Sequence, residues 1–188
     1  MFSLPRPIRS GVHVEVSHDL RAPLEFAYRW CTNYRSDDLT LPNKRWVLER
    51  ARDHVVFEDF NENNPDGFEW RRLFAELHPP DRWRVECRGN RLEASIWYSL
   101  TPGRPGRTRL TIRGMARYLE PGTRKRIHLS RGMSSELGNY LRQNWRSFGP
   151  KLERDYRRSI RESRSANPNR ARRTPSPRIP RSGRRSSR

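Results

Sequence analysis

The spacing of apolar residues changes period once along this chain, and that change limits the folds open to it. Between Arg45 and Leu119, short strand-like runs follow one another, separated by loops rich in Asn, Pro, Asp and Gly. After residues 120–122 the apolar residues recur every three or four positions, which is typical of one long amphipathic helix. A meander of antiparallel strands followed by a long helix predicts the α+β class.

Six runs in the first region are predicted to be strands of one antiparallel sheet. The first two runs form a hairpin, and a tight turn at Gly89-Asn90 leads into the fifth. The predicted strands span residues 46–51, 54–60, 68–77, 82–88, 91–100 and 107–119.

A further strand and a helix are expected before the meander. Alternating valines from Val12 to Val16 have the period of a half-buried strand. Pro23 suits the first turn of a helix, and apolar residues follow it at helical spacing as far as Cys31. Residues 33–42 are polar and turn-prone, with room for a short second helix.

The final helix is predicted from apolar positions between Leu129 and Tyr156. Pro150 lies inside this stretch, and proline removes one helical hydrogen bond, so we expect a kink there. Because the apolar stripe resumes in phase after the proline, one kinked helix is favoured over two separate helices.

This order of elements resembles the START-like, or SRPBCC, superfamily, which includes polyketide cyclase/dehydrase-like and coenzyme-Q-binding members. The resemblance covers residues 11–160 and rests on the opening strand and the helix start at residues 22–27, Ala-Pro-Leu-Glu-Phe-Ala. It implies a helix-grip fold, in which a curved antiparallel sheet of about seven strands wraps around the long C-terminal helix. It also implies a class of ligand, such as lipids, polyketides, quinones or hormones. The superfamily has no universal catalytic residue to transfer to this chain.

Three segments are predicted along the chain. Residues 1–10 form an N-terminal extension, residues 11–161 form the helix-grip domain, and residues 162–188 form a disordered tail rich in Arg, Ser and Pro. The tail contains nine Arg, one Glu and no aromatic residue. Burial of apolar surface therefore cannot offset the entropy lost by ordering it.

Charge favours contact with polyanions. The chain has 40 basic and 21 acidic residues and a net charge of +19, and excess positive charge raises non-specific affinity for nucleic acid and anionic membrane surfaces. All but three of the basic residues are arginine, a bias that fits a GC-rich genome equally well. We therefore expect the tail either to contact such surfaces or simply to act as a solubilising extension.

The cysteine count and the absence of long apolar runs predict the compartment. Cys31 and Cys87 are the only cysteines, and they lie too far apart in sequence to suggest a zinc site. No run resembles a signal peptide or reaches the length of a membrane span. A cytoplasmic protein that is not integral to a membrane is expected.

A pocket for an apolar guest needs apolar walls and a few polar groups that orient the guest. Arg72, Tyr98 and Tyr118 are the preferred polar contacts, because a buried polar tip needs a partner. For any single candidate, an ordinary core position is the more frequent case, because core positions outnumber ligand contacts. The candidate cavity residues are Trp70, Arg72, Phe74, Ile96, Tyr98, Ile112, Tyr118, Leu137, Leu141 and Trp145.

The function expected from these features is binding of a small hydrophobic ligand, such as a lipid, quinone or polyketide-like molecule, between sheet and C-terminal helix. The chain has no nucleophile elbow, P-loop or metal-binding histidine spacing, so catalytic residues stay unassigned, and neither metal nor cofactor is expected. Two alternatives remain open. One is a polyketide cyclase or dehydratase that uses the same cavity. The other is an interaction protein that binds nucleic acid or anionic surfaces through its basic tail.

Overall fold

One sheet and two helices form the part of the chain that the structure describes. The structure is a computed structural model, and it describes residues 3–35, 43–61, 68–120, 122–127 and 131–166. Within these ranges, the side chains of residues 43, 131–137, 140, 144 and 164 are not described.

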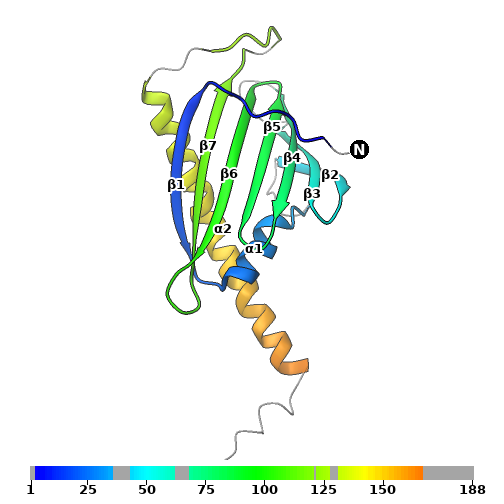
Figure 1. Ribbon diagram of the computed structural model, residues 1–188, viewed down its shortest axis with the longest axis vertical. Coiled ribbons are helices and arrows are strands. Elements are labelled where there is room, and N and C mark those ends of the chain that lie inside the picture. Colours follow the sequence, from blue (N-terminus) through cyan, green and yellow to red (C-terminus); the bar gives the residue numbers. More distant parts are fainter. Residues whose placement is uncertain (1–2, 36–42, 62–67, 121, 128–130, 167–188) are drawn as a thin grey trace, which may run out of the picture.

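The seven described strands form a single antiparallel sheet in the order β1-β7-β6-β5-β4-β3-β2. Each strand except β1 lies beside its neighbour in sequence, so the sheet is a meander with the first strand added at its far edge (Figure 1). The strands are β1 (Val12–Leu20), β2 (Asn43–Arg50), β3 (His54–Asn61), β4 (Glu69–His78), β5 (Arg82–Gly89), β6 (Leu92–Pro102) and β7 (Thr108–Tyr118).

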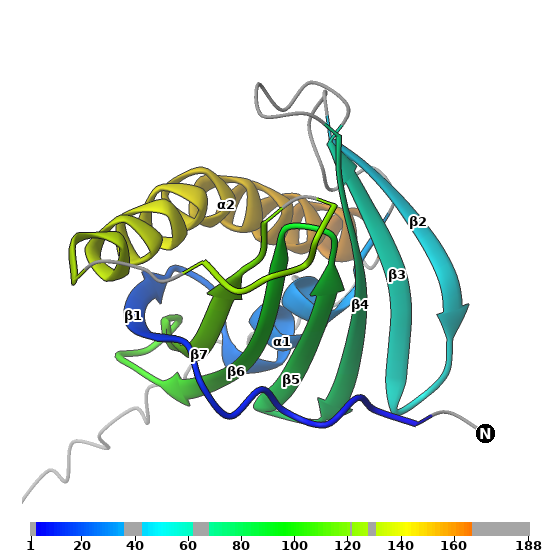
Figure 2. The same cartoon turned by 90° about the horizontal axis from the view of Figure 1, so that it is seen from above.

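Two helices lie on the concave face of this curved sheet. The short helix α1 (Leu24–Thr32) follows β1 and contacts β6. The long helix α2 (Arg131–Ala166) crosses the sheet and packs chiefly against β1, while β2 to β4 curve away from it (Figure 2). The sheet thus grips the C-terminal helix, and the predicted helix-grip architecture is confirmed.

Alternation along the strands assigns the two faces of the sheet. Val16, Leu110 and Ile112 point toward the helices and are almost completely buried, whereas the neighbouring residues Ser17 and Arg113 point away. The core continues across the sheet and into both helices through Leu20, Ala27, Val55, Phe57, Ala75, Trp83, Val85, Leu100 and Leu152.

Leu152 anchors α2 to the body of the protein. Its side chain has no exposed surface. On either side of it, the indole of Trp30 donates a hydrogen bond of 3.0 Å to Asp155, and Arg21 lies 3.8 Å from Glu153. Apolar burial provides most of the attachment, and these polar contacts fix how the helix is rotated.

The helix continues without interruption through Pro150, in agreement with one helix rather than two. It ends at Ala166, so residues 162–166, which were assigned to the tail, are helical. The remainder of the predicted tail, residues 167–188, lies outside the described residues, as do positions 36–42 of the proposed short second helix.

The N-terminal extension lies across the convex face of the sheet, over β4 to β7 (Figures 1 and 2). Ile8 is buried there, and its backbone N–H donates a hydrogen bond of 2.9 Å to the hydroxyl of Ser95. The guanidinium groups of Arg84 and Arg88 donate to the carbonyl oxygens of Pro5 and Arg6. This segment, predicted only as an extension, therefore covers the outside of the sheet.

Glu86 lies beneath this segment with no exposed surface. The hydroxyl of Ser95 donates to its carboxylate over 2.6 Å, and Arg84 and Arg88 lie 2.9 and 3.2 Å from its two oxygens. A buried carboxylate is tolerated only when such partners compensate for lost hydration. The pairing of Glu86 thus depends on two strands and is shielded by the N-terminal segment.

Replacing Leu152 by alanine should destabilise the protein by about 2–5 kcal/mol, because a fully buried leucine leaves both lost apolar contact and a cavity. Arg154→Ala on the same turn removes an exposed side chain and should change stability by less than about 0.5 kcal/mol. Urea unfolding followed by circular dichroism measures both changes. Equal stability losses in the two variants would contradict the anchoring role of Leu152.

Candidate functional site

Small side chains line the middle of the concave face. Ala94 of β6 stands between Ala116 of β7 and Cys87 of β5, and Gly114 pairs with Ile96 one step along the strands. The side chains of Cys87, Ala94 and Ala116 are almost completely buried and pack with Val14, Leu73, Leu92 and Ile96.

Two aromatic pairs stand along this area of small side chains. The rings of Trp83 and Tyr98 stack at 4.7 Å with an interplanar angle of 3°, and those of Tyr34 and Phe57 stack at 4.7 Å and 28°. The indole N–H of Trp83 donates a hydrogen bond to the hydroxyl of Tyr34, which connects the two pairs. Strands β3, β5 and β6 and the segment after α1 thus contribute to one aromatic wall.

A buried ion pair closes the β2 side of the concave face. Arg45 donates two hydrogen bonds, of 2.7 and 2.9 Å, to the two oxygens of Asp59, and both side chains are almost fully buried. The guanidinium carbon lies 4.3 Å above the ring centre of Phe57 and 5.7 Å from that of Tyr34. Bidentate geometry and an aromatic floor compensate the desolvation of this arginine. The pair places fixed positive and negative charge at the border of an otherwise apolar area.

The hydroxyl groups of Tyr34 and Tyr98 are the central polar groups of the site. Burial raises the pKa of Tyr34 well above its ordinary value of 10.0, and burial likewise raises the pKa of Tyr98. Both hydroxyls therefore stay protonated at neutral pH. In this state they act as hydrogen-bond donors and not as bases.

His18 faces the helix from the inner side of β1. Its ring lies 6.0 Å from that of Trp145 on α2, and its Nε2 atom is buried without a hydrogen-bond partner among the described residues. Burial, followed by the charges of Arg142 and Arg146, lowers the pKa of His18 below 6.5, so the imidazole is neutral at neutral pH. A neutral imidazole with an unpaired nitrogen can accept or donate a proton.

Five of the sequence-predicted candidates lie on the helix-facing side. All five belong to or pack against the main core, which includes residues of the strands and of α2. Leu137 belongs to α2, but its side chain lies outside those described, and Tyr118 has inner-face parity at the end of β7. The five on the helix-facing side are Ile96, Tyr98, Ile112, Leu141 and Trp145.

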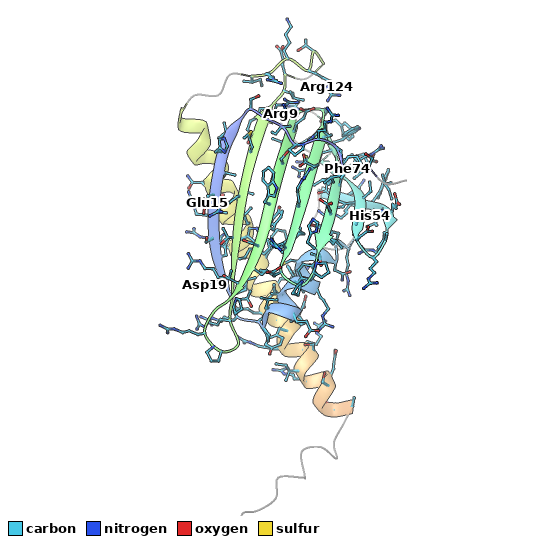
Figure 3. All side chains as sticks on the ribbon, viewed as in Figure 1. Arg9, Glu15, Asp19, His54, Phe74 and Arg124 are labelled. Atoms are coloured by element: carbon cyan, nitrogen blue, oxygen red, sulfur yellow. The ribbon has the colours of Figure 1, made fainter. Side chains whose placement is uncertain are left out.

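Trp70, Arg72 and Phe74 lie on the opposite, convex face, where Figure 3 labels Phe74. Leu73 and Ala75 pack toward the helices, and adjacent strand residues point to opposite sides, so the three predicted side chains face away from the concave surface. Arg72 donates hydrogen bonds to Glu58 on β3, at 2.8 and 2.6 Å.

The sequence interpretation missed four polar residues of the concave face. His18 continues the valine alternation of β1, so its parity alone places it inside. Arg45 and Asp59 have a weaker signal, because their burial depends on strand pairing across a hairpin. Tyr34 follows α1 at a backbone φ of 45°, and no sequence period indicates its direction.

The convex face has a groove of its own, with a volume of about 680 Å³. Trp97, 40% exposed, stands between Arg84 and Arg113 there. Since each arginine is paired with a glutamate, Glu86 or Glu15, this groove carries little free charge. Trp83 and Tyr98, whose rings stack on each other, also contribute to the lining of this groove.

No three His, Cys, Asp or Glu side chains among the described residues gather closely enough to hold a metal ion. No helix within the described ranges is both long and apolar enough to cross a membrane. Cys31 and Cys87 are free, and burial raises the pKa of Cys87 to about 12.

Comparison with solved structures identifies the fold. A START superfamily protein from Mycobacterium smegmatis is similar, with a TM-score of 0.61 and 13% identity over 77% of this chain and 99% of that one. The Zhui aromatase/cyclase from Streptomyces sp. R1128 has a TM-score of 0.59 and 15% identity over 79% and 94%. TTHA0849 from Thermus thermophilus has a TM-score of 0.54 and 15% identity over 78% and 98%. No family model and no curated protein matches the chain. The chain has the START-like helix-grip fold.

Alkaline titration should distinguish the buried tyrosines. Burial raises the pKa of Tyr28 to about 12 and also raises the pKa values of Tyr34 and Tyr98, so the folded protein at pH 11 should show a smaller phenolate absorbance than the denatured protein. Because these folded-state values exceed the unfolded value of about 10, stability should fall as pH rises above 10.

The comparison is made at 295 nm with and without guanidinium. Replacing Tyr34 and Tyr98 together by phenylalanine should reduce the difference in phenolate absorbance between the folded and the denatured protein. Complete titration of the folded wild type by pH 11 would show that these hydroxyls are open to water.

Proposed function

We propose that this protein binds a small, largely aromatic molecule between the concave face of the sheet and α2, with the hydroxyls of Tyr34 and Tyr98 orienting the guest. The proposal places the ligand beside Leu73 of β4 and Ile96 and Tyr98 of β6, inner-face residues that retain accessible surface. The START-like fold supports a ligand-binding role in general terms.

One observation carries the proposal. Leu73, Ile96 and Tyr98 point toward the helices from the central strands, yet each retains accessible surface. Their neighbours Ser95 and Glu86, on the outer face, retain none. Burial raises the pKa of Tyr98, so its hydroxyl stays protonated beside this accessible surface. We infer that the surface left uncovered by these three side chains borders a space that a guest can fill.

The walls of this space favour one ligand chemistry. The flat rings of Tyr34 and Tyr98 offer stacking surfaces, and their protonated hydroxyls donate hydrogen bonds to carbonyl oxygens. Arg45 is already neutralised by Asp59, so the site does not require a charged guest. A quinone or polyketide-like aromatic ketone therefore fits these groups better than a fatty acid does.

A cyclase or dehydratase is the second candidate, and the state of His18 favours it. A neutral imidazole with an unpaired Nε2 can take a proton from a carbon next to a ketone, while a protonated tyrosine stabilises the resulting oxyanion. The aromatase/cyclase among the structural neighbours performs its activity in the same fold at 15% identity. Turnover that is lost in His18→Gln with binding retained would distinguish this role from simple carriage.

Binding of two matched compounds tests the proposal. 1-Acetylnaphthalene and 1-ethylnaphthalene have similar shape, but only the first has a carbonyl. We expect Tyr98→Phe to lower the affinity for the ketone by about threefold to tenfold, which is the contribution of one hydrogen bond. The affinity for the hydrocarbon should be unchanged. Equilibrium dialysis measures both affinities.

A second pair of variants locates the site. Leu73→Trp fills the proposed space and should lower the affinity for both compounds by at least about tenfold, or 1.4 kcal/mol. Phe74→Trp, one residue away on the convex face, should change neither affinity by more than about twofold. Equal effects of the two substitutions, or no binding of either compound to the wild type, would refute the proposed site.

A further inference from the structure

Four arginines form a stripe along the outer face of α2. Arg154, Arg157, Arg158 and Arg161 follow the helical spacing i, i+3, i+4, i+7, and all four are exposed. Together with Pro150 and Glu153 they line a shallow groove of about 430 Å³. We call these four residues the arginine stripe.

The stripe lies on the side of the helix opposite the core contacts. Leu152 is fully buried and Tyr156 packs against the same core, while a helix turns by about 100° per residue, which directs the stripe away from the sheet. Figure 1 shows this end of α2 extending beyond the ends of the strands. Packing against the body therefore leaves these side chains free to meet a partner.

Carboxylates do not neutralise the stripe. Asp155 accepts a hydrogen bond from Trp30 in the body of the protein, and Glu153 lies 3.8 Å from Arg21 and 3.9 Å from Arg157. Among the described residues, no carboxylate lies within ion-pair distance of the other three arginines of the stripe. Glu153 and Asp155 thus help to attach the helix, and Arg154, Arg158 and Arg161 have no carboxylate partner among the described residues.

The length of the stripe matches a polyanion better than a small anion. Seven residues of helix span about 10 Å, over which duplex nucleic acid carries about six phosphate charges. An isolated phosphate could engage only two or three of the guanidinium groups. We propose that the arginine stripe of α2 binds the phosphate backbone of duplex nucleic acid, without reading its sequence.

The composition of the helix surface favours nucleic acid over a membrane. A helix that lies in a membrane interface needs exposed large apolar residues beside its basic face. The exposed large apolar residues of the described structure are Trp46, Val47, Leu48, Phe68, Trp97 and Ile127, and none belongs to α2. Guanidinium groups alone are sufficient for phosphate contacts, which dominate non-specific nucleic-acid affinity.

A salt titration of the full chain tests this proposal. The probe is a fluorescein-labelled DNA duplex of about 20 base pairs, or two helical turns, followed by anisotropy. The stripe variant carries R154Q, R157Q, R158Q and R161Q. The matched control carries R9Q, R52Q, R104Q and R107Q, four exposed arginines elsewhere, and so loses the same charge.

Each phosphate contact contributes about −0.9 to the slope of log K against log salt, so the stripe variant should lose about 3 to 4 units of slope. The control should lose less than about one unit, because diffuse charge makes no fixed contact. Circular dichroism confirms that both variants are folded.

Equal changes in the two variants would overturn the proposal, since net charge alone would then explain binding. An unchanged stripe variant would also overturn it and assign binding to residues outside α2. The same proteins are tested with vesicles of phosphatidylserine and phosphatidylcholine. If the stripe variant lost vesicle binding but kept duplex binding, the partner of the stripe would be a membrane surface and not nucleic acid.

Discussion

The packing of α2 onto the concave face of the sheet is the contact on which the rest of the structure depends. Leu152 is completely buried at this contact, and Asp155 and Glu153 reach Trp30 and Arg21 beside it. The helix packs chiefly against β1. The same contact turns the arginine stripe outward, so the proposed interior site and the proposed nucleic-acid surface both depend on it.

The two faces of the sheet bury charge in different ways. On the concave side Arg45 and Asp59 pair over an aromatic floor, and on the convex side Glu86 is held beneath the N-terminal segment. A buried pair that loses one member leaves an uncompensated charge, which is strongly destabilising. These networks therefore tie β2 to β3, and the N-terminal segment to β5 and β6, more specifically than apolar contact can.

Much of the fold could be predicted from the spacing of apolar residues in the sequence. Which face of β4 points toward the helices could not be predicted in this way. Residues Trp70 and Phe74 on one side and Leu73 and Leu77 on the other are all apolar, so alternation does not distinguish inside from outside. The choice is made by packing against Val85 on β5, which a single strand does not contain. Burial of Arg45 and of the N-terminal segment also arises only from pairing between distant residues. Strand β6, with Ile96 and Tyr98 on its inner face, was predictable because its alternation is less ambiguous.

The central claim is that the concave face encloses space, and one pair of stability measurements tests it directly. Ile96 and Val85 are register partners on the same face, but Ile96 retains accessible surface and Val85 is 3% exposed. If the space exists, Ile96→Phe should change the free energy of unfolding by less than about 1 kcal/mol, while Val85→Phe overpacks the core and costs about 1–3 kcal/mol. Equal destabilisation by both substitutions in urea unfolding would show that this face is filled by its own side chains, and the account of a ligand site would be wrong.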